Sequence, residues 1–365
     1  MRILVLGGGQ QGRVIAADLA RALTDARVTV ADLHRPALPP LGNLEWTDLD
    51  AGDTRAVTRL MAGHDPVVGA LPSRFGFDSM RAAIETRRPM VDVSFSAENP
   101  LDLDSDARRA GVALVPDCGL APGLSHLLVG HAAERAMPDE AIIYVGGVAR
   151  DPTRPYGYMV TWSLDDLLEE YVRPARIVRD GVPVTLPVFS ELERIEIEGA
   201  GEMEAFLSDG LRTLMTTLPI RDMSERTLRW PGHVVSIQPL LATGRFLDEF
   251  RTRCVAEPPD DLVALVVRVR HGDHWQRAGL VDRYDPGSGL TAMSRTTALT
   301  TAAMARLVAR GLALPPGVQP LERVASVSGV WDAMRGILAE HRVDLGDFAA
   351  EPARTSRSPG STSIA

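Results

Sequence analysis

The stretch RILVLGGGQQG at residues 2–12 decides the fold. Residues 2–6 form a short apolar run, which is typical of a parallel strand that is covered on both faces. Three glycines then take the positions of a GxGxxG turn, where they allow the tight turn, the approach of a pyrophosphate and the packing of the next helix. We therefore predict that a dinucleotide is bound through Gly7, Gly9, Gln10, Gln11 and Gly12.

A helix and a second strand follow the turn at the spacing of a dinucleotide-binding unit. Residues 14–23 carry an apolar face, so this helix can lie on a sheet while its N-terminal N–H groups point at phosphate. The strand at 28–31 ends at Asp32, whose carboxylate would accept hydrogen bonds from the ribose of NAD and repel the 2′-phosphate of NADP. Arg35 could instead meet that phosphate, so NAD is the expected cofactor and NADP the alternative.

Composition limits the class of protein. A chain of 365 residues favours two domains, and a hydrophobic content of 45% with 24% charged residues is typical of a soluble globular protein. The net charge of −9 argues against nucleic acid or an anionic membrane as partner, and no apolar stretch approaches a membrane span. Two cysteines, Cys118 and Cys254, cannot build a disulfide framework, and the eight histidines show no metal-binding spacing. We expect a cytoplasmic protein without a metal.

The chain contains no lysine, because all 39 basic residues are arginine. Schiff-base catalysis, a P-loop and a lysine base are therefore excluded. Proton transfer must fall to Asp, Glu, His, Tyr, Cys or water.

Alternating strands and helices continue to residue 124, which predicts an α/β class with a Rossmann-type parallel sheet in a dinucleotide-binding domain at 1–124. Later strands are expected at 44–46, 66–72, 90–93 and 112–116, with a helix at 77–86. Loops at the carboxyl ends of such strands face the ligand. Leu71, Pro72 and Ser73 should thus border the cofactor, and Ser94 and Phe95 should lie on the same rim.

The pattern changes after residue 124. A helix at 124–137 leads into strands, and runs at 262–270 and 274–284 predict a hairpin. We interpret 125–291 as a substrate-binding α+β domain with a mainly antiparallel sheet, whose edge could pair across a two-fold axis in a homodimer. A helix at 294–312 belongs to a segment, 292–345, that should return to the first domain. The tail at 349–365 has too little apolar content to fold and is predicted to be disordered.

Several segments, in order, resemble the saccharopine dehydrogenase and reductase family. Asp117–Gly123 resembles its "GLxPG" segment, and Leu228–His233 is similar to its "LRYxGH" segment. The Tyr144–Gly147, Tyr156–Tyr158 and Pro174–Gly181 segments follow in that family's order.

Alanine in Gly-Leu-Ala-Pro-Gly looks closer to lysine 6-dehydrogenase than to saccharopine reductase, whereas Gly69 departs from the lysine enzymes, which tend to have Asn. The resemblance implies NAD-dependent oxidation of the ε-amine of L-lysine to a semialdehyde that closes to a cyclic imine. The alternatives are NADPH-dependent reduction of a saccharopine- or carboxynorspermidine-type imine, and a catalytically silent dinucleotide-binding protein.

Amine oxidation requires an acid that takes a proton from nitrogen before hydride leaves carbon. Asp117, at the end of a strand, is the first candidate, although it could equally cap the following helix. Cys118 could line the nicotinamide pocket or simply fill the core.

Substrate residues are predicted from the family's substrate loop. Arg212 would hold the α-carboxylate as a bidentate fork, and Asp209 the α-ammonium. Tyr156, with Tyr158 and Trp162, could wall the aliphatic chain or belong to the core. His233 is a possible proton shuttle, yet it could be structural in its Pro-Gly turn.

Overall fold

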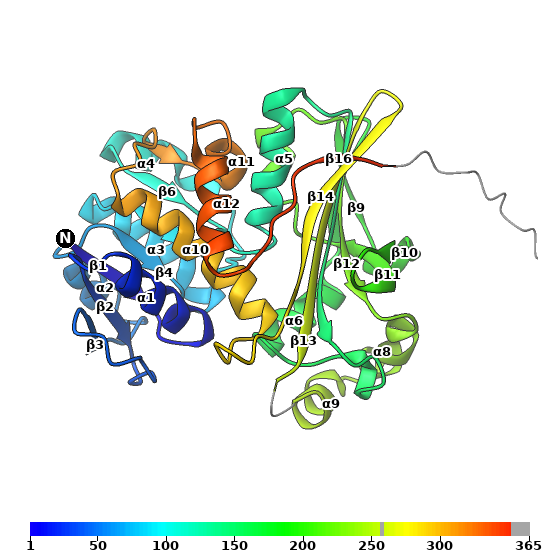
Figure 1. The fold of residues 1–365 in the computed structure, drawn as a ribbon, viewed down its shortest axis with the longest axis horizontal. Helices are drawn as coiled ribbons and strands as arrows, with labels where there is room; N and C mark the ends of the chain where they lie inside the picture. Colours follow the sequence, from blue (N-terminus) through cyan, green and yellow to red (C-terminus); the bar gives the residue numbers. More distant parts are fainter. Residues whose placement is uncertain (256–258, 352–365) are drawn as a thin grey trace, which may run out of the picture.

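The computed structural model describes residues 1–255 and 259–351, which form two lobes, each built on a sheet (Figure 1). The first sheet is parallel and has seven strands in the order β15-β6-β5-β4-β1-β2-β3. Read from the other edge, strands β1 to β6 have the doubly wound order 3-2-1-4-5-6, in which the order reverses between β1 and β4. The strands are β1 (Arg2–Leu6), β2 (Arg27–Asp32), β3 (Leu44–Asp48), β4 (Val67–Gly69), β5 (Met90–Asp92), β6 (Ala113–Val115) and β15 (Gly317–Val318).

The structure of the first lobe differs from the sequence-based prediction in two places. The seventh strand, β15, pairs in parallel with β6, and its two residues are too short to give a periodic signal. The helix predicted at 77–86 begins at Ser73, directly after Pro72, so its first turn reaches the sheet edge. The helices of this lobe are α1 (Gln10–Ala22), α2 (Thr54–Met61), α3 (Ser73–Thr86) and α4 (Asp104–Ala110), with the 3₁₀ turn η1 (Pro100–Leu103).

The second sheet has nine strands and is mainly antiparallel, as predicted. Its main path runs β10-β11-β12-β7-β13-β14-β16, and the β12–β7 pair is parallel. The predicted hairpin is present as β13 and β14, which turn at Gly272 with a φ of 57°. The strands are β7 (Glu140–Ala149), β8 (Ala175–Arg179), β9 (Val182–Leu186), β10 (Glu193–Ile197), β11 (Gly201–Ser208), β12 (Asp222–Arg229), β13 (Asp261–His271), β14 (His274–Arg283) and β16 (Ala349–Ala350).

Helices from the later part of the chain fill the space between the two sheets (Figure 1). α10 contacts both α1 and β13, and α5 contacts both α11 and β13. These helices are α5 (Leu124–Arg135), α10 (Ala292–Ala309), α11 (Leu321–Val324) and α12 (Val330–Glu340). The rest of the second lobe carries α6 (Leu164–Val172), α7 (Leu214–Thr217), α8 (His233–Ala242), α9 (Phe246–Arg253), and the 3₁₀ turns η2 (Pro155–Gly157) and η3 (Val188–Ser190).

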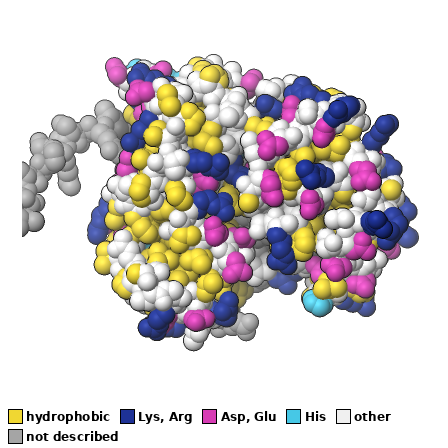
Figure 2. Space-filling view, turned by 180° about the vertical axis from the view of Figure 1, so that it is seen from behind, with side chains coloured by type: hydrophobic (Ala, Val, Ile, Leu, Met, Phe, Trp, Pro, Cys, Tyr) yellow, Lys and Arg dark blue, Asp and Glu magenta, His cyan; other side chains and the backbone are white. Residues whose placement is uncertain are grey.

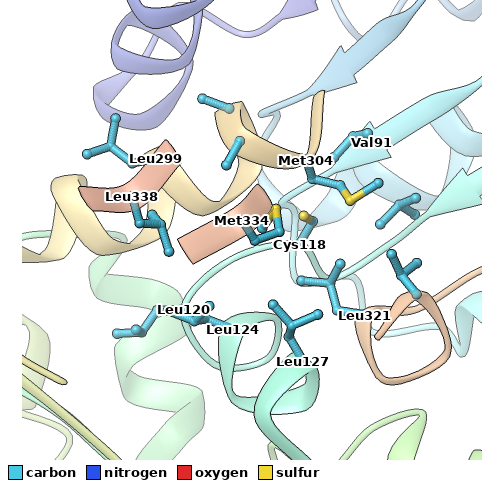
Figure 3. Close-up of a cluster of buried hydrophobic side chains, with 14 of the residues drawn as sticks. Val91, Cys118, Leu120, Leu124, Leu127, Leu299, Met304, Leu321, Met334 and Leu338 are labelled. Carbon is cyan, nitrogen blue, oxygen red and sulfur yellow. The ribbon is translucent and has the colours of Figure 1, made fainter. Parts of the chain in front are cut away.

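One hydrophobic cluster joins the two sheets. It includes Val5 of the parallel sheet and Leu265 of the second sheet, and Leu124, Met304 and Met334 lie between them. Figure 3 shows part of this cluster, where side chains from α5, α10, α11 and α12 surround the loop that carries Cys118 and Leu120. Because the core is continuous, the sheet faces that form the site are held on a common support.

The predicted disorder from residue 349 is wrong at its first residues. Residues 349–350 form β16 and pair with β14, and Glu351 makes two hydrogen bonds of 2.6 Å to Arg268. The prediction was based on the low apolar content of this segment, which does not show that Glu351 pairs with the buried Arg268. Residues 352–365 lie outside the described residues.

Charged side chains of both signs lie side by side on the face in Figure 2. Hydrophobic side chains gather at its lower left, on the lobe that carries α8 and α9. None of the helices in the described part of the chain is long and apolar enough to cross a bilayer.

Candidate functional site

A cavity of about 500 Å³ lies between the carboxyl ends of the parallel strands and one face of the second sheet. Its volume falls in the range of small-molecule sites. The first lobe contributes the glycine turn and the loops after β4, β5 and β6, and the second contributes α6 and one face of β7, β11 and β12. Polar or charged lining residues include Gln10, Gln11, Asp32, Ser73, Ser94, Ser163, Asp166, Glu169, Glu170, Arg173, Ser208, Asp209, Glu225 and Arg229.

The glycine turn has the space that a pyrophosphate needs. A Cβ on Gly12 would lie 1.9 Å from the carbonyl oxygen of Gly7, so this glycine lets α1 pack on the strand. A Cβ on Gly9 would meet no atom within 4 Å, and Gly9 faces the cavity. The first turn of α1 thus fits a phosphate group.

Asp32 is held beside this turn by backbone hydrogen bonds. Its carboxylate accepts hydrogen bonds from the backbone N–H of Gly8, at 2.6 Å, and of His34, at 2.9 Å. Arg35 lies nearby with its guanidinium 6.0 Å from the ring centroid of Trp46. Both an acid and an arginine are therefore available to a ribose at this position.

Arg229 is the best-supported arginine of the cavity. It is 2% exposed and donates to Glu170 at 2.8 Å, to the hydroxyl of Tyr171 at 2.7 Å and to the carbonyl of Leu228 at 2.8 Å. Its guanidinium lies 5.1 Å from the ring centroid of Tyr158. Five N–H groups are available to an arginine, so two remain for a ligand.

His233 orients this arginine rather than facing the cavity. Its Nδ1 lies 2.6 Å from the carbonyl oxygen of Tyr156, which can only accept, so Nδ1 carries the proton. Nε2 then accepts from the hydroxyl of Tyr171, at 2.9 Å, and this hydroxyl accepts from Arg229. Burial, together with the charge of Arg229, lowers the pKa of His233 to about 3. A proton-shuttle role is not supported, because the ring stays neutral.

Glu225 also lines the cavity, on the same face of β12 as Arg229. Its Oε1 accepts a hydrogen bond from Ser208 at 3.1 Å, and its Oε2 has no partner among the described residues. Burial raises the pKa of Glu225 to about 7, against the lowering effects of His126 and Ser208. A carboxyl group with such a pKa can both accept and donate a proton near neutral pH.

Asp117 and Arg212 are buried together, each with a side chain 3% exposed. Arg212 donates to both carboxylate oxygens, at 3.1 and 3.2 Å, and lies 4.6 Å from the ring centroid of Phe95. Neither residue lines the cavity. The expected roles of Asp117 as base and Arg212 as substrate fork are therefore not supported, because the two charges satisfy each other.

Two domain models of one family match the chain. The saccharopine dehydrogenase NADP-binding domain matches residues 3–115, and the saccharopine dehydrogenase C-terminal domain matches residues 119–343. The chain belongs to the saccharopine dehydrogenase family.

Relatives with curated names are about a quarter identical to the chain over the segments that align. Saccharopine dehydrogenase [NADP(+), L-glutamate-forming] of Saccharomyces cerevisiae is 26% identical over 189 residues, which are 49% of this chain and 42% of that protein. The mitochondrial α-aminoadipic semialdehyde synthase of Bos taurus is 25% identical over 191 residues, 49% of this chain and 20% of that protein. The matches thus span less than half the length of these relatives.

A solved structure has the same fold. Apo saccharopine dehydrogenase (L-Glu forming) from Saccharomyces cerevisiae superposes with a TM-score of 0.76 at 18% identity, and the match covers 96% of this chain and all of that one. The parallel sheet and the mainly antiparallel sheet that the pattern of strands and helices predicts are confirmed.

The saccharopine dehydrogenase fold brings most of the predicted residues to the cavity. Those that line it are Gly7, Gly9, Gln10, Gln11, Asp32, Leu71, Pro72, Ser73, Ser94, Phe95, Tyr158, Trp162 and Asp209. Asp209, however, is held by Arg176 through hydrogen bonds of 2.7 and 2.8 Å, so its charge is already balanced.

Other predicted residues lie behind the cavity wall: Gly12, Asp117, Cys118, Tyr156, Arg212 and His233. Cys118 is fully buried, and burial raises the pKa of its thiol far above neutral pH, so a filling role fits it better than chemistry. Tyr156 stacks on Phe250 at 5.3 Å and belongs to a core. No group of three His, Cys, Asp or Glu that could hold a metal occurs within residues 1–255 and 259–351.

Sequence reasoning missed Arg229, Glu170 and Glu225. Arg229 stands inside the Leu-Arg-Trp-Pro-Gly-His segment, which carried the resemblance, so this arginine could have been found. Glu225 and Arg229 are four residues apart on β12, where alternate residues share a face, but nothing in the sequence marks which face is buried.

Proposed function

We propose that the protein is a nicotinamide-dinucleotide-dependent oxidoreductase that interconverts an amine and an imine on a lysine-derived amino acid such as saccharopine. One observation carries the proposal: a pyrophosphate-sized turn and a buried arginine with free N–H groups face the same cavity. A bound dinucleotide would supply the hydride donor or acceptor.

Residues of the chain would bind and orient the amino acid. Arg229 fits a carboxylate as a planar fork, and its own partners fix its direction. Arg173 also lines the cavity and is paired with Glu169 at 3.4 Å, so it offers a second, more exposed cation. Saccharopine carries several carboxylates, and two lining arginines favour it over a substrate with one.

L-lysine is the second candidate substrate. Ala121 of the Gly-Leu-Ala-Pro-Gly loop lines the cavity, and alanine at this position resembles lysine 6-dehydrogenase. The test is the absorbance of reduced nicotinamide after the enzyme is mixed with NAD or NADP and either saccharopine or L-lysine at alkaline pH. Turnover of neither amine, in either direction, would contradict the proposed function.

We expect the charge of Asp32 to disfavour NADPH, whose 2′-phosphate would lie beside it. Asp32→Asn should therefore raise the affinity for NADPH about tenfold relative to NADH, which is about 1.4 kcal/mol. Fluorescence titration of both cofactors measures the ratio without turnover. Arg35→Ala is the control: a loss of NADPH binding there, with no gain in Asp32→Asn, would assign the 2′-phosphate to the arginine.

We expect Arg229→Lys to weaken substrates that carry a carboxylate, because lysine keeps the charge but loses the fork. The KM for saccharopine or L-lysine should rise by about 10- to 100-fold, as expected for lost charged hydrogen bonds. Cadaverine, the diamine without a carboxylate, is the control substrate. An equal loss on cadaverine would remove Arg229 from carboxylate binding.

A further inference from the structure

We propose that Glu225 is the residue that exchanges a proton with the substrate nitrogen. The inference deepens the proposed function and rests on it. It replaces Asp117, which sequence order suggested, by a carboxyl group that lies in the cavity itself.

The contacts of Glu225 leave one oxygen for a ligand. Ser208, its register partner on β11, donates to Oε1, whereas Oε2 is buried without a partner among the described residues. A Cβ on Gly210 would lie 1.7 Å from Oε1, so the loop after β11 needs glycine to leave room for this carboxyl group. Glu225 is 5% exposed, so few water molecules can reach its carboxyl group, and it faces the cavity.

Most other acids of the cavity are paired with an arginine or bound to backbone N–H groups. Glu170 binds Arg229 at 2.8 Å, and Glu169 binds Arg173 at 3.4 Å. Asp209 is held by Arg176, and Asp32 is bound to backbone at the glycine turn. Asp166, like Glu225, has a serine hydroxyl at 3.1 Å, but its side chain is partly exposed. Glu225 is thus the buried carboxyl group of the cavity that has neither an arginine nor a backbone N–H group as a partner among the described residues.

The groups packed around Glu225 set its charge. Ser208 comes from β11, Asp209 from the loop after it and Glu170 from α6. His126 of α5 forms a buried pair with Glu322 of α11 at 3.4 Å. Burial lowers the pKa of His126, but the hydrogen bond and charge of Glu322 outweigh it and raise the pKa. The charge of His126, when this residue is protonated, favours the ionised form of Glu225 and so opposes the effect of burial on the pKa of Glu225.

The proton step is balanced within the site. In amine oxidation, ionised Glu225 takes a proton from the substrate ammonium, so an O–H bond forms and an N–H bond breaks. Nitrogen keeps the electron pair, which forms the C=N bond as the C–H bond breaks, and the hydride from carbon would pass to the oxidised nicotinamide of the proposed function. In imine reduction, protonated Glu225 returns the proton to nitrogen.

The pH dependence has opposite signs in the two directions. The folded pKa of Glu225 is raised to about 7, so kcat/KM for amine oxidation should fall below about pH 7, where the base is protonated. For imine reduction, kcat/KM should fall above about pH 7. Glu225→Gln should lower kcat by about 10²- to 10⁴-fold. It should also abolish the limb of the pH profile, that is, the change of kcat/KM near pH 7. The Kd for NADPH, measured by fluorescence, should stay unchanged.

A second variant tests the assignment if Glu225→Gln folds poorly. Ser208→Ala removes a hydrogen bond that lowers the pKa of Glu225, so the limb should move to higher pH. Glu202→Gln, an exposed acid on β11 paired with Arg194, is the control and should leave the profile unchanged.

Asp92 is the other carboxyl group that could cause this change of kcat/KM near pH 7. Burial raises its pKa to about 7 despite two hydrogen bonds from Ser94. A pH profile that keeps this change in Glu225→Gln and loses it in Asp92→Asn would overturn the assignment.

Infrared difference spectra distinguish a wrong assignment of Glu225 from failure of the proposed function. Below pH 7, L-lysine or saccharopine should remove a protonated-carboxyl band that Glu225→Gln lacks, with or without turnover. If neither L-lysine nor saccharopine changes the protonated-carboxyl band, the inference is overturned.

Discussion

Arg212→Met should lower the free energy of unfolding by about 3–5 kcal/mol, because it leaves the carboxylate of Asp117 buried without its partner. Arg212 makes both hydrogen bonds to Asp117 and a third, at 3.4 Å, to the carbonyl of Glu98. It therefore joins the loop after β11 to the loops after β5 and β6. Chemical denaturation of the whole protein measures the loss.

The partner variant separates the lost pair from lost packing. Asp117 has a φ of 51°, a conformation that asparagine tolerates, so Asp117→Asn removes the charge without new backbone strain. The double variant should be more stable than the sum of the two single losses by more than about 1 kcal/mol, since no buried charge remains alone. Simple additivity would contradict the pairing.

An exposed pair gives the control. Arg194 lies 2.7 Å from Glu202, and both side chains are more than half exposed. Arg194→Met should change the free energy of unfolding by less than about 0.5 kcal/mol, because solvent screens such pairs. A loss as large as that of Arg212→Met would mean that burial is not what makes the Asp117 pair important.

Most of the fold could be predicted because its signals are local. The first strand, the glycine turn, the helix after it and Asp32 lie within 32 residues, and the structure has them as β1, α1 and β2. The hairpin of β13 and β14 is marked by a long apolar run in β13 and by a glycine at the turn. β15 and β16 could not be predicted, since each has two residues whose partners lie far along the chain.

The part of the candidate site that a single sequence motif forms could be predicted. The part that depends on contacts between the two lobes could not. The turn residues and Ser73 line the cavity at the expected edge. Arg212 has the chemistry for a carboxylate, but the acid it binds is Asp117, 95 residues earlier. Arg229 takes the cavity position because Glu170, Tyr171 and His233 orient it, and these lie on other elements. Charge pairing across elements, which the order of residues does not encode, decides which arginine is free.

The two glycines of the turn should respond differently to the same added methyl group. In Gly12→Ala the Cβ would lie 1.9 Å from the carbonyl oxygen of Gly7, so backbone must move. We expect a loss of about 1–3 kcal/mol in the free energy of unfolding, as for overpacked cores, together with loss of dinucleotide binding.

Gly9→Ala is the matched variant, because its Cβ meets no atom and the φ of −67° suits alanine. Its stability should stay within about 1 kcal/mol of the parent, since alanine is a poorer N-cap than glycine. Its Kd for NADH and NADPH should nevertheless rise at least about tenfold, because the methyl group occupies the space next to the N-terminus of α1 where phosphate would lie. Thermal unfolding and cofactor fluorescence measure the two quantities separately. Unchanged affinity in Gly9→Ala would mean that the dinucleotide does not approach this turn, whatever Gly12→Ala does to the fold.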